Sequence, residues 1–193
     1  MTADPDTDTG TGTGIRIRGI SAADWDAVAA LESAVYGPLG LSEGRAALES
    51  RGRASPSTCF ALHHARGLAG YLLAFPYPAN RCPDLLRPER TAHRSHNLHL
   101  HDIVVAEELR GRGHGRTLLN HLSGAARSAG YRSLSLVAVA GMDTFWAALG
   151  YRTQDGVTPP PHYGGSAVYM SKTIREGRPH GAKNPRTPHD SHR

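Results

Sequence analysis

The most informative stretch of this chain runs from Asn97 to Leu122 and reads NLHLHDIVVAEELRGRGHGRTLLNHL. It predicts a buried strand, a short turn, a glycine-rich loop and an amphipathic helix, in that order. The loop, Arg110 to Gly115, leaves backbone N–H groups unobstructed at the start of the helix, where the helix dipole is positive. Because Gly113 and Gly115 carry no side chain, an anion can approach closely. The stretch therefore predicts a site for a phosphate or pyrophosphate.

The spacing of this loop excludes two common nucleotide-binding motifs. A P-loop needs Lys followed by Ser or Thr after its second glycine, whereas Arg116 and Thr117 follow here at a different spacing. A dinucleotide-binding loop needs G-x-G-x-x-G and an acidic residue at the end of the next strand. The next expected strand, Ser133 to Val139, contains no acid. What remains is R-x-x-G-x-G directly after a strand.

The residues downstream extend this pattern. After the loop, small and apolar residues follow a helical repeat at Leu118, Leu119, Leu122, Ala125, Ala126 and Ala129. Gly130 stands where a helix commonly ends in a left-handed residue. The segment from Met142 to Tyr151, MDTFWAALGY, then predicts a short helix that ends at a glycine. In order and spacing, 98–151 resembles the GNAT superfamily of N-acetyltransferases, whose last segment reads F-Y-x-x-L-G-F.

The resemblance implies a fold and a reaction. It implies an α/β domain whose mixed, mostly antiparallel sheet is flanked by helices and splayed between its fourth and fifth strands, at Leu98–Val105 and Ser133–Val139. It also implies direct transfer of the acetyl group of acetyl-CoA to a primary amine of a small molecule or peptide, without a covalent enzyme intermediate. The residues that it assigns to CoA are Ile103, Val104 and Val105 along the pantetheine, Gly111, Arg112, Gly113, His114, Gly115 and Arg116 at the pyrophosphate, and Phe145 in the pantetheine channel. Arg110 is expected to orient the loop.

Two histidines precede the loop, and strand alternation places His99 and His101 on one face. Two histidines on one strand face bind a metal, relay protons or simply pack in the core. No third metal ligand is evident, so no metal site is expected. The H-L-H pattern resembles the arylalkylamine N-acetyltransferases, and the attacking amine must be neutral, so we expect both histidines to act as base or relay. Asp102 is expected to point to the other face and make a structural hydrogen bond.

One position departs from the family's pattern. Many members carry a tyrosine that protonates the leaving thiolate, but that residue is Trp146 here, and an indole N–H does not give up a proton near neutral pH. The asparagine often found seven residues earlier is Val139. Tyr163 is the candidate acid, with packing at the edge of the fold as its alternative role. A non-catalytic CoA sensor, and transfer from another acyl-CoA or an acyl carrier protein, stay open as alternative functions.

The chain of 193 residues is predicted to form one domain over 15–171, between disordered tails over 1–14 and 172–193. The expected upstream elements are an edge strand over 15–18, a helix from Ser21 to about Val35, a helix capped by Ser42 to about Ser50, and a hairpin of 59–63 and 68–75 turned at 65–67. A long proline-containing segment, 76–96, follows.

Composition sets the remaining expectations. No apolar run is long enough to span a bilayer, no signal peptide is evident, and Cys59 and Cys82 read as ordinary thiols, so a cytoplasmic protein is expected. The net charge of +5 suits an anionic cofactor, and no nucleic-acid partner is expected. Lysine occurs only at positions 172 and 183, which is typical of a GC-rich bacterial genome. The expected partner is a small-molecule amine, and a homodimer is left open.

Overall fold

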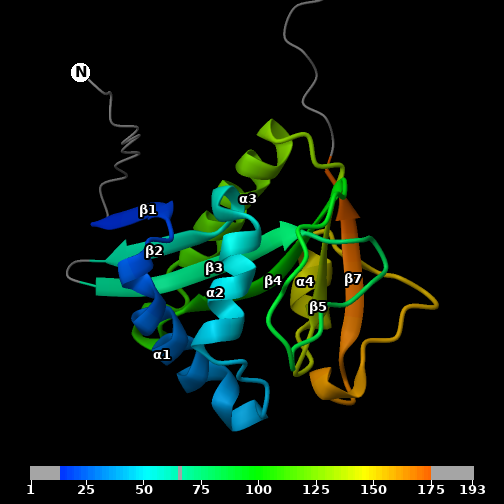
Figure 1. The fold of residues 1–193 in the computed structure, drawn as a ribbon, viewed down its shortest axis with the longest axis horizontal. Coiled ribbons are helices and arrows are strands. Elements are labelled where there is room, and N and C mark those ends of the chain that lie inside the picture. Colours follow the sequence, from blue (N-terminus) through cyan, green and yellow to red (C-terminus); the bar gives the residue numbers. More distant parts are fainter. Residues whose placement is uncertain (1–13, 65–66, 175–193) are drawn as a thin grey trace, which may run out of the picture.

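The computed structural model describes residues 14–64 and 67–174, which form a sheet covered by helices (Figure 1). The strands are β1 (Ile15–Gly19), β2 (Phe60–His64), β3 (Gly67–Pro76), β4 (Asn97–Val105), β5 (Ser133–Ala138), β6 (Arg152–Thr153) and β7 (Val168–Thr173). The α-helices are α1 (Trp25–Tyr36), α2 (Arg45–Ala54), α3 (His114–Ser128) and α4 (Asp143–Ala148). The tails expected over 1–14 and 172–193 fall mostly outside the described residues, as do residues 65 and 66 of the expected hairpin turn.

The strands lie in the order β1-β2-β3-β4-β5-β7-β6. Neighbouring strands are antiparallel except β4 and β5, which run parallel. This parallel pair is short, because only 97–99 of β4 pair with 133–135 of β5. Beyond those residues the two strands diverge while β5 stays paired with β7. The expected mixed sheet, splayed between its fourth and fifth strands, is confirmed.

Each face of the sheet packs against its own helices. On one face, Leu118 and Leu122 of α3 belong to a buried cluster with Leu98 and Leu134 of the sheet. On the other face, α1 and α2 contribute Trp25, Val28 and Leu48 to a second cluster with Tyr71, Leu73 and Val104. Figure 1 shows α1 and α2 together on one side of the sheet and α3 on the opposite side. These two apolar layers hold β4 in place from both faces.

A β-bulge interrupts the pairing of β3 with β4. Leu73 pairs with Asp102 and Ala74 pairs with Leu100, so His101 has no partner on β3. The extra residue shifts the alternation of side chains along the rest of β4. Asp102 therefore lies on the α1–α2 face, opposite Leu73, and not on the far face as expected. Strict alternation predicted the wrong side because a bulge is not visible in the sequence.

Three boundaries differ from the sequence-based expectations. The hydroxyl of Ser42 donates to Glu32 at 2.7 Å instead of capping α2, which begins at Arg45 after Gly44. The helix expected from Ser21 begins with a 3-10 turn before α1, and Ser21 bonds to Asp24 there. Strand β7 continues through residues 172 and 173, which we assigned to the tail, because both pair with β5.

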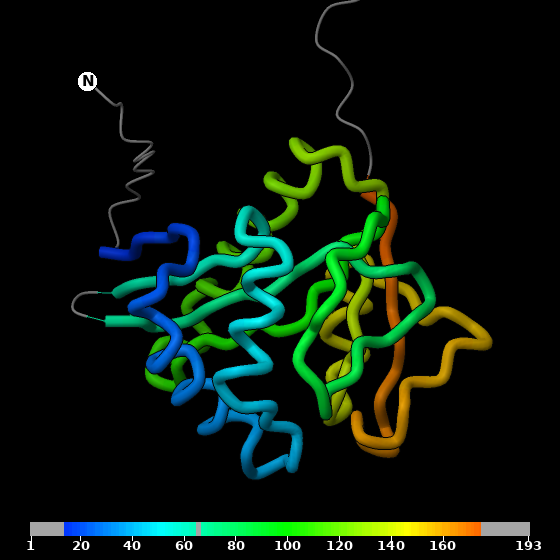
Figure 2. Tube along the Cα trace, in the orientation of Figure 1, coloured from blue at the N-terminus to red at the C-terminus, as the bar shows by residue number. Residues whose placement is uncertain are grey.

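Two long connections, 77–96 between β3 and β4 and 154–167 between β6 and β7, meet beside the diverging strands (Figure 2). The Tyr163 hydroxyl in the second donates to the carbonyl of Pro83 in the first, at 2.8 Å. The backbone N–H of Asn80 donates to the Tyr169 hydroxyl of β7 at 2.9 Å. The proline-containing segment is thus fixed against the C-terminal part of the fold.

Candidate active site

A cleft of about 450 Å³ opens where β4 and β5 diverge. Its walls are mostly apolar and come from β4, β5, α4, the first turn of α3 and the end of α1. They include Ile103, Val104, Val105, Gly115 and Phe145, which the sequence assigned to the cofactor. The cleft opens where β5 turns away from β4 after three paired residues, and within 14–64 and 67–174 no other strand pairs with β4 on that side.

The glycine loop lies at one end of this cleft. Gly113 has φ 86° and stands at the N-terminus of α3, a backbone conformation that other residues rarely adopt. The Nε of Arg110 donates to the carbonyl of Val105 at 3.1 Å, which ties the loop to the end of β4. Arg110 therefore orients the loop. Arg112 and Arg116 are exposed beside the first turn of α3.

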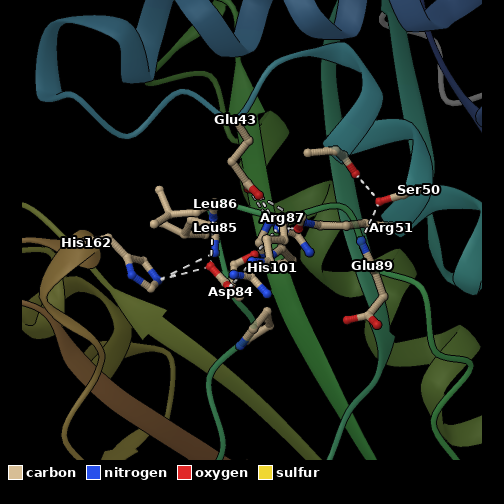
Figure 3. A network of polar contacts seen from close by, with 12 residues as sticks. Glu43, Ser50, Arg51, Asp84, Leu85, Leu86, Arg87, Glu89, His101 and His162 are labelled. Atoms are coloured by element: carbon tan, nitrogen blue, oxygen red, sulfur yellow. Dashed lines mark hydrogen bonds and ion pairs between the residues drawn. The ribbon is translucent and has the colours of Figure 1, made fainter.

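A buried hydrogen bond to Glu43 holds His101 at the other end. The Nε2 of His101 lies 2.5 Å from Glu43 Oε1, and only 2% of the imidazole is exposed (Figure 3). Glu43 also accepts from Arg51, whose guanidinium donates to the carbonyl of Asp84 at 2.9 Å. Burial raises the pKa of Glu43, but the charges and hydrogen bonds of His101 and Arg51 outweigh it, so the pKa lies below its usual value. Glu43 is thus held as a carboxylate facing His101.

His99 has a different environment from His101. It is 1% exposed and lies outside the lining of the cleft. Its Nδ1 is 3.0 Å from the Ser135 hydroxyl, and its ring stacks near Tyr169 at 6.4 Å. Burial, together with the charges of His101 and Arg51, lowers its pKa well below the usual value. The two histidine rings are 6.3 Å apart, but only His101 reaches the cleft.

A second, smaller cavity of about 50 Å³ adjoins the cleft. Its lining shares Tyr36, His101 and Asp102 with the cleft, so the two cavities meet at these side chains. Asp102 Oδ2 accepts a hydrogen bond from the Tyr71 hydroxyl. Burial raises the pKa of Asp102 to about 6. The structural hydrogen bond expected of Asp102 is present, but the residue also faces both cavities.

The two aromatic residues considered for the acid step are both largely buried. The Tyr163 hydroxyl lines the small cavity but donates to the carbonyl of Pro83 at 2.8 Å, and burial raises its pKa. Trp146 is 8% exposed and packs edge to face against Phe145 at 5.1 Å and Tyr151 at 5.5 Å. Trp146 is therefore part of the core as well as of the cleft wall.

Sequence reasoning missed the groups that surround His101. Glu43 was interpreted only as an acid favouring the start of a helix, and Arg51 and Glu32 were not singled out. Glu43 lies 58 residues from His101 along the chain, and no local motif joins them. Glu43 precedes α2 and lies eight residues from Arg51, which is not the i,i+3 or i,i+4 spacing of a helical ion pair, so that pair gave no local signal either.

Within residues 14–64 and 67–174, no three His, Cys, Asp or Glu side chains are grouped to hold a metal ion. Nor does any helix in those ranges combine the length and apolar character needed to cross a membrane.

A sequence profile of the acetyltransferase (GNAT) family matches residues 25–151, so the chain belongs to this family. The matched region runs from the start of α1 to Tyr151, directly before β6, and includes the whole cleft. The family is one of acyltransferases, and homologues in it bind CoA thioesters.

Individual relatives agree with this assignment. Mouse N-alpha-acetyltransferase 80 is 39% identical over 71 residues, covering 37% of this chain and 22% of that protein, so the match spans about a fifth of the relative. The structure of Ard1 from Thermoplasma volcanium has a TM-score of 0.65 at 17% identity, covering 84% of this chain and 99% of that one. The GphF GNAT-like decarboxylase in complex with isobutyryl-CoA has a TM-score of 0.64 at 23% identity, covering 83% and 100%. At these identities the two structures show the fold alone.

Proposed function

We propose that the protein transfers the acetyl group of acetyl-CoA directly to a primary amine. The observation that carries this proposal is the meeting of two cavities at His101, one shaped for an acyl-CoA and the other small and polar. A donor in the cleft and an amine in the small cavity would approach each other beside a buried imidazole. Direct transfer needs this arrangement, because both substrates must be held together.

The described residues fit acetyl-CoA. Unobstructed backbone N–H groups at Gly113 and the first turn of α3 suit a pyrophosphate. The apolar wall formed by 103–105 and Phe145 suits the pantetheine arm. In the described residues, β4 has no strand partner on its β5 side beyond His99, so its backbone is free to pair with an extended ligand.

His101 is the group that we assign as base. Glu43 accepts hydrogen bonds only, so the Nε2 of His101 carries its proton toward Glu43 and leaves Nδ1 as the lone-pair nitrogen. Nδ1 is buried and has no hydrogen-bond partner among the described residues. The amine nitrogen gives a proton to this atom, and Glu43 stabilises the resulting imidazolium. His99 lines neither cavity and its Nδ1 lies beside the Ser135 hydroxyl, so we assign it a supporting position behind His101 and not the proton transfer itself.

Proton return to the thiolate is assigned to solvent. The Tyr163 hydroxyl is bonded to Pro83, and its raised pKa makes it a weak acid. Trp146 has no transferable proton near neutral pH. A thiolate needs no strong acid, because free thiols ionise near pH 8.5 and thiolates are moderate leaving groups.

A different acyl donor is the second candidate, and one observation favours it. The cleft has room beside its apolar wall, and the GphF relative holds isobutyryl-CoA. In that case the same base and loop act on a branched acyl group. A third possibility, a CoA sensor without activity, follows from the loss of the tyrosine at Trp146.

Release of CoA thiol from acetyl-, propionyl- and isobutyryl-CoA tests these functions. Each donor is incubated with a panel of primary amines, and products are identified by mass. We expect turnover with acetyl-CoA, and an amide product 42 Da heavier than the amine (about the mass an acetyl group adds in place of hydrogen). Faster turnover with isobutyryl-CoA selects the second candidate. A CoA-induced rise in melting temperature without turnover on any amine selects the sensor, and no binding of CoA refutes all three.

A further inference from the structure

The small cavity is surrounded by buried carboxylates. Glu32, Glu43 and Asp102 all contribute to its lining, and each is 6% exposed or less. The one arginine bonded to this group, Arg51, is paired with Glu43. Glu32 accepts hydrogen bonds from 42 and 43. Within the described residues the cavity therefore has more negative than positive charge, which favours a cationic ligand.

A cluster of acids alone does not make a binding site, but Asp102 adds a second observation. Its Oδ1 is buried and has no hydrogen-bond partner in the described part of the chain, while Oδ2 is bonded to Tyr71. Buried carboxylate oxygens are nearly always hydrogen-bonded, because desolvation without a partner is costly. Asp102 lines both cavities, so a ligand at their junction can supply the missing donor.

Structural needs do not account for Asp102. The hydroxyls of Tyr71 and Tyr36 both act as hydrogen-bond donors toward this side chain, and a neutral amide oxygen at position 102 would also accept from them. The buried carboxyl instead has a pKa raised to about 6, because burial outweighs the hydrogen bonds and the nearby His101. The free protein thus holds a poorly compensated carboxylate beside its proposed base. A positive group at Oδ1 would compensate it.

We propose that Asp102 binds the ammonium group of the acceptor, so that the acceptor is an alkylamine that enters as a cation. This inference rests on the proposed function and names its substrate class. The ammonium donates one N–H to Asp102 Oδ1, and a second N–H faces His101 Nδ1, which takes the proton. The neutral nitrogen then forms the C–N bond as the C–S bond to CoA breaks, and the sulfur leaves as the thiolate. The new amide nitrogen loses its remaining extra proton to solvent, and solvent protonates the thiolate.

The size of the small cavity further restricts the class of acceptor. About 50 Å³ accommodates only a few atoms of the size of a water molecule, so an aminomethyl end fits and a bulky secondary amine does not. An alcohol of the same shape lacks the charge and leaves Asp102 uncompensated. The acceptor is therefore a slender primary alkylamine, protonated in solution.

Steady-state kinetics of Asp102→Asn tests this assignment. With acetyl-CoA as donor and benzylamine, phenethylamine, putrescine and alaninamide as acceptors, we expect the amine KM to rise about ten- to hundredfold, because a hydrogen bond to a charged group is lost. The KM for acetyl-CoA should stay the same and kcat should change by less than about threefold. Asp155→Asn, which alters an exposed carboxylate, is the matched control. An unchanged amine KM, or a fall in kcat alone, would overturn the assignment.

A second measurement needs no variant. The melting temperature of the wild-type protein with saturating CoA is compared in phenethylamine and in 2-phenylethanol, which differ in the charged group. We expect phenethylamine, but not 2-phenylethanol, to raise the melting temperature. Equal effects of the two compounds would overturn the inference. If CoA itself causes no shift and no amine is acetylated, the proposed function fails instead. The two failures are therefore distinguishable.

Discussion

The two ends of the cleft are proposed to bind their ligands by different physical interactions. The glycine-loop end offers backbone N–H groups and a helix dipole from an exposed segment of consecutive residues, 110–116. The His101 end uses buried side-chain charges, with Glu43 shared between His101 and Arg51. A substitution in the loop therefore acts locally. A substitution at the buried end alters several charges at once, because each charge is compensated by the others.

The largest effect is expected from a charge placed at the loop end. Gly113→Glu puts a carboxylate where we propose that the pyrophosphate binds, so the CoA-induced rise in melting temperature should disappear. Gly130→Glu is the matched control, because Gly130 also has a positive φ of 76° but lies beyond the far end of α3. Both variants carry a left-handed strain of about 1–2 kcal/mol. Normal CoA binding by Gly113→Glu would show that the loop is not the anion site.

At the buried end, substitutions of the two histidines should have different effects on turnover. His101→Gln removes the proposed base and should lower kcat by roughly a hundredfold or more at neutral pH, with CoA binding intact. His99→Gln should cost less than about tenfold, because His99 lines neither cavity. Rate profiles from pH 5 to 9 provide the measurement, and the low-pH limb should change in His101→Gln. Equal losses in both variants would show that the relay needs both rings.

Replacing Asp102 should also stabilise the folded protein, because its buried carboxylate is poorly compensated. The pKa of Asp102 is raised to about 6 in the folded protein from an ordinary 3.8, so ionisation opposes folding. This penalty is absent below pH 4, grows as the pH rises to 6 and is complete above it, at about 3 kcal/mol. Asp102→Asn cannot ionise and should melt higher than wild type at pH 7.5, with the difference vanishing near pH 4. Thermal melts across this range check it, and lower stability at pH 7.5 would contradict it.

The smallest effect is expected at Trp146, which belongs to both the core and the cleft wall. Trp146→Tyr leaves a void beside Phe145 and Tyr151 and should cost about 1–2 kcal/mol, or a few degrees in melting temperature. Turnover should fall or stay the same, because the site does not rely on a phenol at this position. Melting curves and kcat are measured together. Faster turnover with unchanged stability would show instead that the missing tyrosine limits the enzyme.

The same contrast between the two ends explains what the sequence revealed. The loop end depends on glycines and a helix start in consecutive residues, so Arg110 to Gly115 could be proposed as an anion site from their order alone. The buried end depends on the bulge at His101, which moved Asp102 to the other face, and on Glu43 and Arg51, which reach His101 only through the packing of α2 against β3. Neither bulges nor distant contacts leave a local pattern. The splayed sheet was anticipated through the family resemblance and not from periodicity.

One guanidinium couples the long connection 77–96 to the proposed base. Arg51 donates to the carbonyls of Asp84 and Arg87 in that connection and also to Glu43, which faces His101 (Figure 3). Exchanging the connection for that of a relative would therefore do more than reshape the acceptor entrance. It would move the guanidinium and, through Glu43, the hydrogen bond that holds the imidazole. Acceptor preference and turnover would then change together, so an effort to retarget this protein by loop grafting has to keep the two backbone carbonyls that hold Arg51 in place.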